Sequence, residues 1–259
     1  MTRNKMLLIT ATVLIAGVVF LVFFVGPRLQ RSFFYPTQRG LPDVVTNTTA
    51  ELLARLQSVL ETNVPMVAQS LQPGLTDVQI SALETEGGFH LSDDLRSFYK
   101  WHDGTVTNST IGIVPGQRFL PLDEFVREQA LVRQQAGAMT MFQRVAVVVL
   151  TRHRKDWVTV LDDGAGDGYF FDPKRKENEG AFFYHFSESS HYLWFPSFRN
   201  FLFGTIESYE SHAVKLATDG KSLEEDFSRT KKIWERLAKL SGSESINIPL
   251  SPAENTPQR

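Results

Sequence analysis

The apolar run at the amino terminus constrains the chain most, because it determines which part can fold in water. Met6 to Val25 contains 20 residues without a charged side chain. As a helix that rises about 1.5 Å per residue, this run is about 30 Å long, which matches the hydrocarbon core of a bilayer. It is apolar on every face, so a core helix of a water-soluble domain is not expected. We predict a transmembrane anchor over residues 6–26, after a short tail at 1–5.

A cleaved secretory signal is the alternative interpretation of this run. Such a signal has a shorter apolar stretch followed by a small-x-small cleavage site, whereas this run ends in Gly26-Pro27-Arg28. Positive residues flank it on both sides, with Arg3 and Lys5 before it and three arginines after it. The positive-inside rule is therefore nearly balanced, and the short positive tail only slightly favours a soluble domain outside the cytoplasm. The expected localisation is a membrane, with a single pass.

The composition excludes several functional classes. The chain has no cysteine, which excludes disulfides, a cysteine nucleophile and thiolate metal sites. The net charge of −2 provides no overall attraction to nucleic acid. The sequence contains no phosphate-binding loop, no dinucleotide-binding glycine motif and no serine nucleophile elbow. We therefore expect no nucleic-acid partner and no small-molecule substrate.

Capping motifs predict several helices in the first half of the chain, after a juxtamembrane linker at 27–47 that prolines and glycines punctuate. A serine or threonine at the N-cap accepts a backbone N–H of the first turn, and a glutamate or glutamine three residues later completes a capping box. The motifs are Thr48-x-x-Glu51 before a helix at 50–62, Thr76-x-x-Gln79 before a helix that ends at Gly87-Gly88, and Ser92 before a helix that ends at Gly104. A further helix is expected over 123–135.

Runs of β-branched and aromatic residues predict a strand-rich block after these helices. The unbroken run Val145–Leu150 is expected as a buried central strand. The other expected strands lie within 111–114, 118–122, 157–163, 168–173, 181–186 and 191–195. Two more helices are expected, over 198–214 after Ser197 and over 223–240 after Ser222.

This order of elements is typical of an α+β domain. We predict a mostly antiparallel sheet with helices packed on one side, preceded by one transmembrane helix. The domain is expected at 48–215, followed by a carboxy-terminal helix within 216–240. Residues 241–259 are rich in serine, proline and asparagine, and are predicted to be a disordered tail.

The stretch WVTVLDDGAGDGYFFDP, from Trp157 to Pro173, combines four aspartates with three glycines. Clustered carboxylates bind hard cations, so a metal-dependent hydrolase that uses the Asp162–Asp172 cluster is one hypothesis. The spacing does not fit a calcium-binding EF-hand, because Ala165 occupies the third position counted from Asp163. Asp-Gly and Gly-Asp-Gly supply the positive φ angles that a hairpin turn needs. We therefore interpret the stretch as a hairpin and predict no metal site and no catalytic residue.

Aromatic residues crowd the segment from Trp101 to Phe198 and leave two interpretations open. Period-two alternation buries only half of the side chains of a half-exposed strand. The rings therefore either line an exposed protein-binding groove or form a large core under the helices.

Four motifs between residues 70 and 210 resemble the SUKH superfamily, in the order typical of that family. They are Leu91-Ser92-Asp93-Asp94-Leu95 with His102-Asp103-Gly104, FLPLDEF at 119–125, the aspartate stretch at 157–173, and YLWFPSFRNFLFGTIESY at 192–209. Ser92 stands where the family usually has proline, and Thr159 where proline is frequent. The predicted anchor, the last helix and the tail lie outside the usual domain.

The resemblance implies a non-enzymatic α+β binding module without cofactor or catalytic residues. The family includes fungal Smi/Knr cell-wall-assembly regulators and bacterial immunity proteins. Our leading hypothesis is a membrane-anchored immunity protein that neutralises a toxin, and the alternative within the same class is a scaffold or regulator of envelope assembly. Acidic side chains would suit a basic toxin surface. The candidate partner contacts are Trp101, His102, Asp103, Asp162, Asp163, Asp167 and Tyr169.

Overall fold

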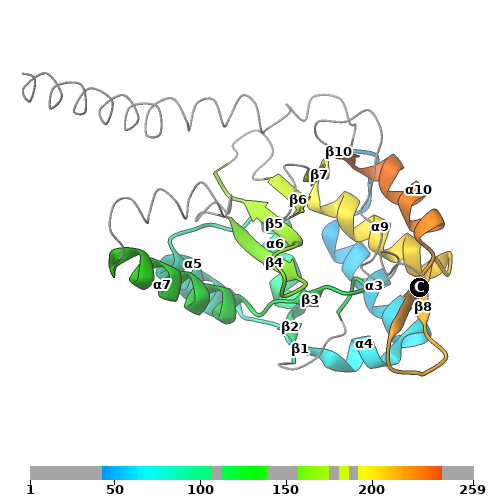
Figure 1. Cartoon of the computed structure of the whole chain (residues 1–259), viewed down its shortest axis with the longest axis horizontal. Helices are drawn as coiled ribbons and strands as arrows, with labels where there is room; N and C mark the ends of the chain where they lie inside the picture. Colours follow the sequence, from blue (N-terminus) through cyan, green and yellow to red (C-terminus); the bar gives the residue numbers. More distant parts are fainter. Residues whose placement is uncertain (1–42, 107–111, 139–156, 175–180, 187–191, 241–259) are drawn as a thin grey trace, which may run out of the picture. The chain divides into compact units, whose positions relative to one another are not determined.

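The computed structural model of the 259-residue chain describes residues 43–106, 112–138, 157–174, 181–186 and 192–240 (Figure 1). The predicted anchor at 6–26, the strand expected at 145–150 and the tail at 241–259 lie outside these residues. In the described ranges, no helix combines the length and the apolar character that crossing a membrane requires.

The predicted capping motifs begin the helices of the first half. The described helices are α3 (Thr49–Asn63), α4 (Pro65–Ser70), α5 (Asp77–Gly87), α6 (Asp93–Trp101), α7 (Leu122–Ala138), α9 (Phe198–Glu210) and α10 (Phe227–Leu237). Both expected capping boxes are present, Thr48 with Glu51 before α3 and Thr76 with Gln79 before α5. The Ser92 hydroxyl accepts a backbone N–H of the first turn of α6. These capping predictions are confirmed. Helix α6 ends at Trp101 and not at Gly104 as expected, because His102–Thr105 form strand β2.

The helix expected over 198–214 begins as predicted and ends early. Ser197 is its N-cap, and Glu210 is its last residue. His212 has a positive φ of 56°, which lies outside the right-handed helical region and reverses the chain. Val214 then begins strand β8.

Helix α10 begins later than the motif Ser222-x-x-Glu225 predicts, because Ser222 belongs to a hairpin turn. Its hydroxyl donates to Asp219 Oδ2 at 2.9 Å. Leu223–Glu225 form a strand that pairs with β8. Asp226 is the N-cap of α10 instead. The helix expected over 223–240 is therefore corrected to Phe227–Leu237.

The described strands form antiparallel sheets, as predicted. They are β1 (Leu71–Pro73), β2 (His102–Thr105), β3 (Arg118–Phe119), β4 (Val158–Asp162), β5 (Gly168–Asp172), β6 (Ala181–His185), β7 (Tyr192–Trp194), β8 (Val214–Leu216), β9 (Leu223–Glu225) and β10 (Lys239–Leu240). Six of them form one sheet in the order β10-β7-β6-β5-β4-β3, in which every neighbouring pair is antiparallel. The pairs β1–β2 and β8–β9 are also antiparallel. The fold class is therefore α+β.

Two expected strands are shorter than predicted. The strand expected at 118–122 contains only Arg118 and Phe119, because Pro121 has no N–H to donate and is followed directly by α7. In the expected strand at 111–114, Val114 forms an isolated bridge with Gln117.

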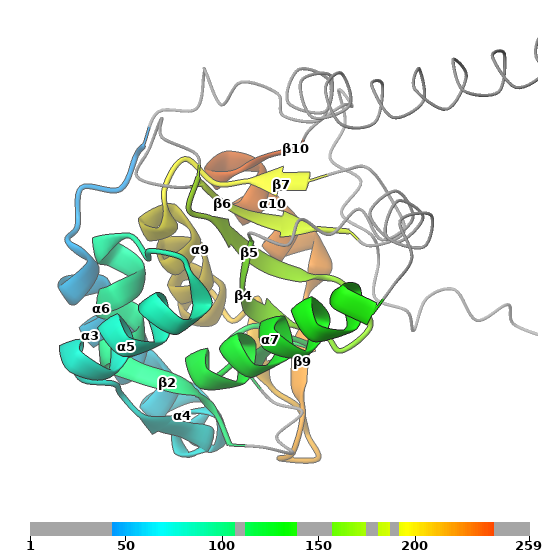
Figure 2. The ribbon, with the colours of Figure 1, turned by 90° about the vertical axis from the view of Figure 1, so that its left-hand side faces the viewer.

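Aromatic residues form a core between the sheet and the helices. Phe201 on α9 lies with its ring centroid 4.8 Å from that of Tyr169 and 4.9 Å from that of Phe182. Trp234 of α10 stacks parallel to Phe201, at 6.2 Å. It fits there because Gly204 has no side chain, and an added Cβ would lie 2.3 Å from the indole ring. Figure 2 shows α9 and α10 behind the strands and α7 beside β4.

The burial of the aromatic rings decides between an exposed groove and a large core. Of the rings considered from Trp101 to Phe198, Trp101 and Tyr184 are half-buried and the others are buried. Tyr169 and Phe182 face α9, while the sheet register places Phe170 and Phe183 on the opposite face. The core interpretation is therefore confirmed for the described residues.

Candidate functional site

The aspartate stretch is a hairpin whose turn is organised by Asp163. The Oδ1 atom of this carboxylate accepts backbone N–H groups from Ala165 at 2.8 Å, Gly166 at 3.0 Å and Asp167 at 3.0 Å. Gly164 and Gly166 both have positive φ, at 75° and 110°. The hairpin interpretation is confirmed, and the Asp163 side chain is occupied mainly in holding the turn.

Asp162 lies at the end of β4, opposite Arg118 on β3. Arg118 Nε is 3.5 Å from Asp162 Oδ1, and Arg118 Nη1 is 2.8 Å from Glu124 Oε1 at the start of α7. Burial raises the pKa of Asp162, and the opposing attraction of Arg118 is the next contribution. One guanidinium therefore lies between two carboxylates that approach it from different elements.

Asp103 on β2 contacts the beginning of α7. Its Oδ1 accepts the backbone N–H of Leu122 at 2.9 Å, which satisfies a donor that the first turn of a helix leaves free. Burial raises the pKa of Asp103; the hydrogen bond from Leu122 lowers it, and the nearby charge of Asp123 raises it further. Asp103 thus positions α7 and also adds negative charge beside it.

Trp101 is the last residue of α6, and His102 is the first residue of β2. The Trp101 ring stacks on Phe98 with centroids 5.7 Å apart. His102 Nδ1 lies 2.6 Å from the Gln72 carbonyl oxygen, and Nε2 lies 3.1 Å from Gln57 Oε1. Both side chains are half-buried and contact their own domain.

Asp167 is the last residue of the turn, and Tyr169 lies on strand β5. Asp167 Oδ2 accepts a hydrogen bond from the Tyr184 hydroxyl at 3.4 Å. Tyr169 is only 5% exposed, and its ring packs against Phe201. Burial raises the pKa of Tyr169. The Tyr169 side chain therefore belongs to the core and packs the hairpin against α9.

The carboxylates of the hairpin and of α7 together form an acidic surface. Sequence analysis did not select the α7 members, although the spacing of four residues between Glu124 and Glu128 places both on one face of a helix. Burial raises the pKa of Glu128, and the charges of Glu124 and Asp162 add to this effect. We define the acidic surface as Asp103, Asp123, Glu124, Glu128, Asp162, Asp163 and Asp167, with Arg118 and Arg127 among them.

The four aspartates proposed for a metal-dependent hydrolase do not converge on one point. Asp162 faces Arg118, Asp163 faces its own turn, and Asp167 contacts Tyr184. Asp172 is buried at the other end of β5, where it accepts the backbone N–H of Lys174. In the ranges that the structure describes, no three histidine, cysteine or acidic side chains are grouped so that they could hold a metal ion.

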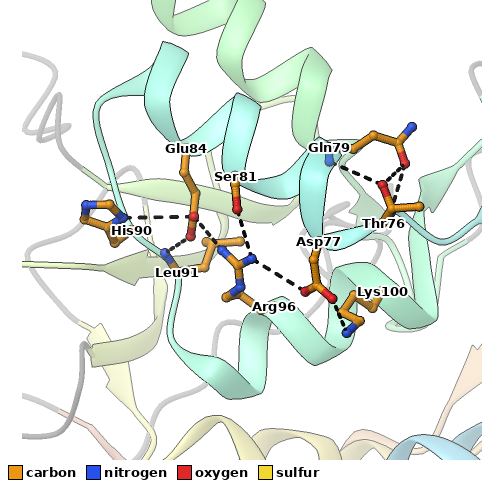
Figure 3. Close-up of polar contacts among 9 residues, drawn as sticks. All are labelled: Thr76, Asp77, Gln79, Ser81, Glu84, His90, Leu91, Arg96 and Lys100. Carbon is orange, nitrogen blue, oxygen red and sulfur yellow. Dashed lines mark hydrogen bonds and ion pairs between the residues drawn. The ribbon is translucent and has the colours of Figure 1, made fainter.

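A second polar cluster connects α5 to α6, and sequence analysis did not select it (Figure 3). Glu84, which is 6% exposed, accepts the backbone N–H of Leu91 at 2.8 Å and pairs with Arg96 at 2.5 Å. Arg96 and Lys100 both pair with Asp77, at 3.6 and 2.8 Å. We call these residues the α5–α6 cluster. Each of its two carboxylates pairs with at least one cation, whereas two carboxylates of the acidic surface, Glu124 and Asp162, share Arg118.

Comparison with known proteins places this geometry in a family. A family model described as the SMI1 / KNR4 family (SUKH-1) matches residues 74–204, just over half of the 259-residue chain. The match includes α5 to β7, the α5–α6 cluster and the whole acidic surface, and it ends inside α9. A search of curated proteins finds no match. The chain therefore belongs to the SMI1 / KNR4 family (SUKH-1).

Proposed function

We propose that the chain is a membrane-tethered protein-binding domain whose acidic surface docks a basic protein, and that it acts as an immunity protein that neutralises a toxin. Membership of the SMI1 / KNR4 family suggests a protein-binding domain of this type. The observation that carries the proposal is the acidic surface itself. The anchor predicted at residues 6–26 supplies the tether.

The acidic surface has more negative than positive charge. It contains seven carboxylates and two arginines, so it has an excess of five negative charges when every carboxylate is ionised. Arg118 already contacts Glu124 and Asp162. Such an excess attracts a cationic partner over distances of about one Debye length, about 8 Å at physiological salt. Complementary charge mainly accelerates association and selects among partners.

A direct test compares two double variants of the full chain. Any basic protein that a neighbouring gene encodes is the first partner to test, with binding followed by surface plasmon resonance. Asp123→Asn/Glu128→Gln removes two charges from the acidic surface, and we expect the association rate to fall about tenfold at low salt and less at high salt.

The matched control removes two carboxylates elsewhere. Glu86→Gln/Glu235→Gln changes exposed glutamates of α5 and α10 by the same charge. The control is expected to bind as the wild type does. An equal loss of association rate in both double variants would contradict docking at the acidic surface, since net charge alone would then explain the effect.

Regulation of envelope assembly is the second candidate function. The family description, which includes the SMI1 / KNR4 name, and the predicted anchor support it. The same surface would then dock a basic envelope protein. Cross-linking through a photoreactive group at Ala165, next to Asp163, separates the two functions, because the captured protein is a toxin in one case and an assembly protein in the other.

A further inference from the structure

We propose that a charged clamp around Arg199 fixes the point at which the chain enters the domain, so that a tethered domain presents its acidic surface away from its attachment. The orientation of the acidic surface in this proposal rests on the proposed function. The clamp consists of Asp43, Asn47, Asp94, Arg199 and Asn200. Asp43 is the first described residue, and it follows the predicted anchor and most of the predicted linker in the sequence.

Asp43 contacts the beginning of α9 with both carboxylate oxygens. Oδ1 accepts a hydrogen bond from Asn200 Nδ2 at 2.7 Å and another from the backbone N–H of Val45 at 3.0 Å. Oδ2 lies 2.9 Å from Arg199 Nη2. Asn200 is fully buried, and Arg199 and Asn200 belong to the first turn of α9, where negative charge is favoured. Charge-assisted contacts of this kind are stronger than neutral hydrogen bonds.

Arg199 extends the clamp to two other helices. Its Nη1 donates to the Asn47 carbonyl oxygen at 3.5 Å, immediately before the N-cap of α3. Its Nε lies 3.9 Å from Asp94 Oδ2, in the first turn of α6. Asp94 in turn accepts a hydrogen bond from the Thr49 hydroxyl of α3. The beginnings of α3, α6 and α9 are therefore held together with the incoming chain.

The strand register places the clamp and the acidic surface at opposite ends of the sheet. Gly168, His185 and Tyr192 pair across β5, β6 and β7, and the Asp163 turn lies beyond this end. Strand β7 runs from this end of the sheet to the opposite end. There the Phe195 N–H donates to the carbonyl oxygen of Phe182, near the beginning of β6, and α9 begins three residues later. Phe198, next to Arg199, packs on Phe182 with ring centroids 4.9 Å apart, and Phe182 lies near the end of β6 that is remote from His185.

Helix α6 provides independent evidence that the clamp and the acidic surface are separated. Asp94, in its first turn, contacts Arg199, whereas Asp103 follows its last residue, Trp101. Its nine residues, at about 1.5 Å each, separate the two ends by roughly 13 Å.

The clamp also shortens the tether. Residues 43–47 belong to the linker predicted from sequence, yet they contact α9 in the structure. An extended chain spans at most about 3.4 Å per residue, so release of these five residues would add up to about 17 Å of reach. The clamp therefore sets both the direction and the length of the connection.

The absence of cysteine permits a distance measurement on the full chain. Spin labels at Thr46→Cys and Ala165→Cys, both exposed positions, report on the incoming segment and on the aspartate turn. With the clamp intact, pulsed dipolar spectroscopy is expected to give one narrow distance distribution. Arg199→Ala is expected to lose that narrow peak, while Arg236→Ala, which removes an ion pair between α10 and Glu207, is expected to keep it. A broad distribution without any substitution, or a narrow one with Arg199→Ala, overturns the clamp.

The orientation is tested in liposomes that contain a fluorescence quencher in the lipid headgroups. A fluorophore at position 46 is expected to be quenched more than one at position 165. Equal quenching, or stronger quenching at 165, overturns the orientation. These measurements need no partner, so a chain that shows the clamp and the orientation but binds no basic protein contradicts the proposed function alone.

Discussion

The acidic surface and the α5–α6 cluster both contain several carboxylates, but they balance charge differently. In the α5–α6 cluster, Glu84 pairs with Arg96, and Asp77 pairs with Arg96 and Lys100. In the acidic surface, Arg118 lies between two carboxylates, and the nearby charges raise the pKa of Glu128 after the main effect of burial. Paired charges of opposite sign stabilise a fold, whereas like charges close together repel one another. The α5–α6 cluster therefore holds two helices together, whereas the acidic surface has an excess of negative charge.

The largest expected effect breaks the matched cluster. Glu84→Ala would leave the Arg96 guanidinium and the Leu91 N–H without their buried acceptor. Removal of one partner of a buried pair typically costs about 3 kcal/mol of unfolding free energy. Chemical denaturation measures this loss. Glu86→Ala, two residues away and exposed, should change stability by less than about 0.5 kcal/mol. A similar small change for Glu84→Ala would mean that the cluster does not hold α5 to α6.

The next effect separates the structural member of the acidic surface from the others. Asp163→Ala removes the acceptor of three backbone N–H groups, and we expect a loss of about 2 kcal/mol. Asp163→Asn keeps a side-chain oxygen and should retain most of this stability. The comparison of the two variants by thermal unfolding tests hydrogen bonding rather than charge. Equal losses in both would indicate that charge is what matters.

The two regions should respond to pH with opposite signs. Burial raises the pKa of Asp103 and Asp162, so the folded protein takes up protons before the unfolded chain does, and this contribution to stability rises as pH falls from the raised pKa towards the ordinary value near 4. The hydrogen bond from Lys100 lowers the pKa of Asp77, whose contribution is present above the ordinary pKa and is lost as pH falls through the lowered one.

Denaturation between pH 3 and pH 7 checks this contrast. Asp103→Asn/Asp162→Asn should remove stability gained on acidification, while Asp77→Asn should reduce the loss at the lowest pH. An unchanged pH profile in the first variant would show that these carboxyls have ordinary pKa values in the folded protein.

The smallest expected effect concerns one surface charge. Glu128 is exposed, and its charge is disfavoured by burial of part of the side chain and by Glu124 and Asp162. Glu128→Gln should therefore stabilise the fold at pH 7 by a few tenths of a kcal/mol, since solvent screens most of the repulsion. The same change is expected to slow association with a basic partner. Thermal unfolding measures the gain in stability, and binding kinetics measure the slower association. A variant that loses both stability and association rate would argue against repulsion within the acidic surface.

Local sequence predicted most of the helices and the hairpin, because these depend on neighbouring residues. Thr48, Thr76 and Ser92 cap their helices through contacts three residues away. The late start of α10 shows the limit of such motifs, since Ser222 satisfies the sequence pattern but its hydroxyl bonds to Asp219 in a turn. A motif predicts a cap only if no competing turn uses the same hydroxyl.

Contacts between distant residues were beyond sequence reasoning. Arg118 and Asp162 meet because β3 pairs with β4, and the register of that pair is not encoded in either segment alone. Asp43 meets Asn200 across 157 positions of the chain. The predicted site residues Asp103 and Asp163 lie in the acidic surface, yet each also accepts backbone hydrogen bonds, a role that only the structure reveals. Tyr169 was selected for binding and instead lies in the core.

The packing of Trp234 on Gly204 has a practical consequence for the preparation of this domain. The family match ends at residue 204, and the domain boundary predicted from sequence lies at 215, but α10 and β10 cover Phe201 and the free edge of β7. A fragment cut at either boundary would expose an aromatic patch and an unpaired strand, and both promote aggregation. Recombinant fragments for partner screens should therefore extend at least to Leu240.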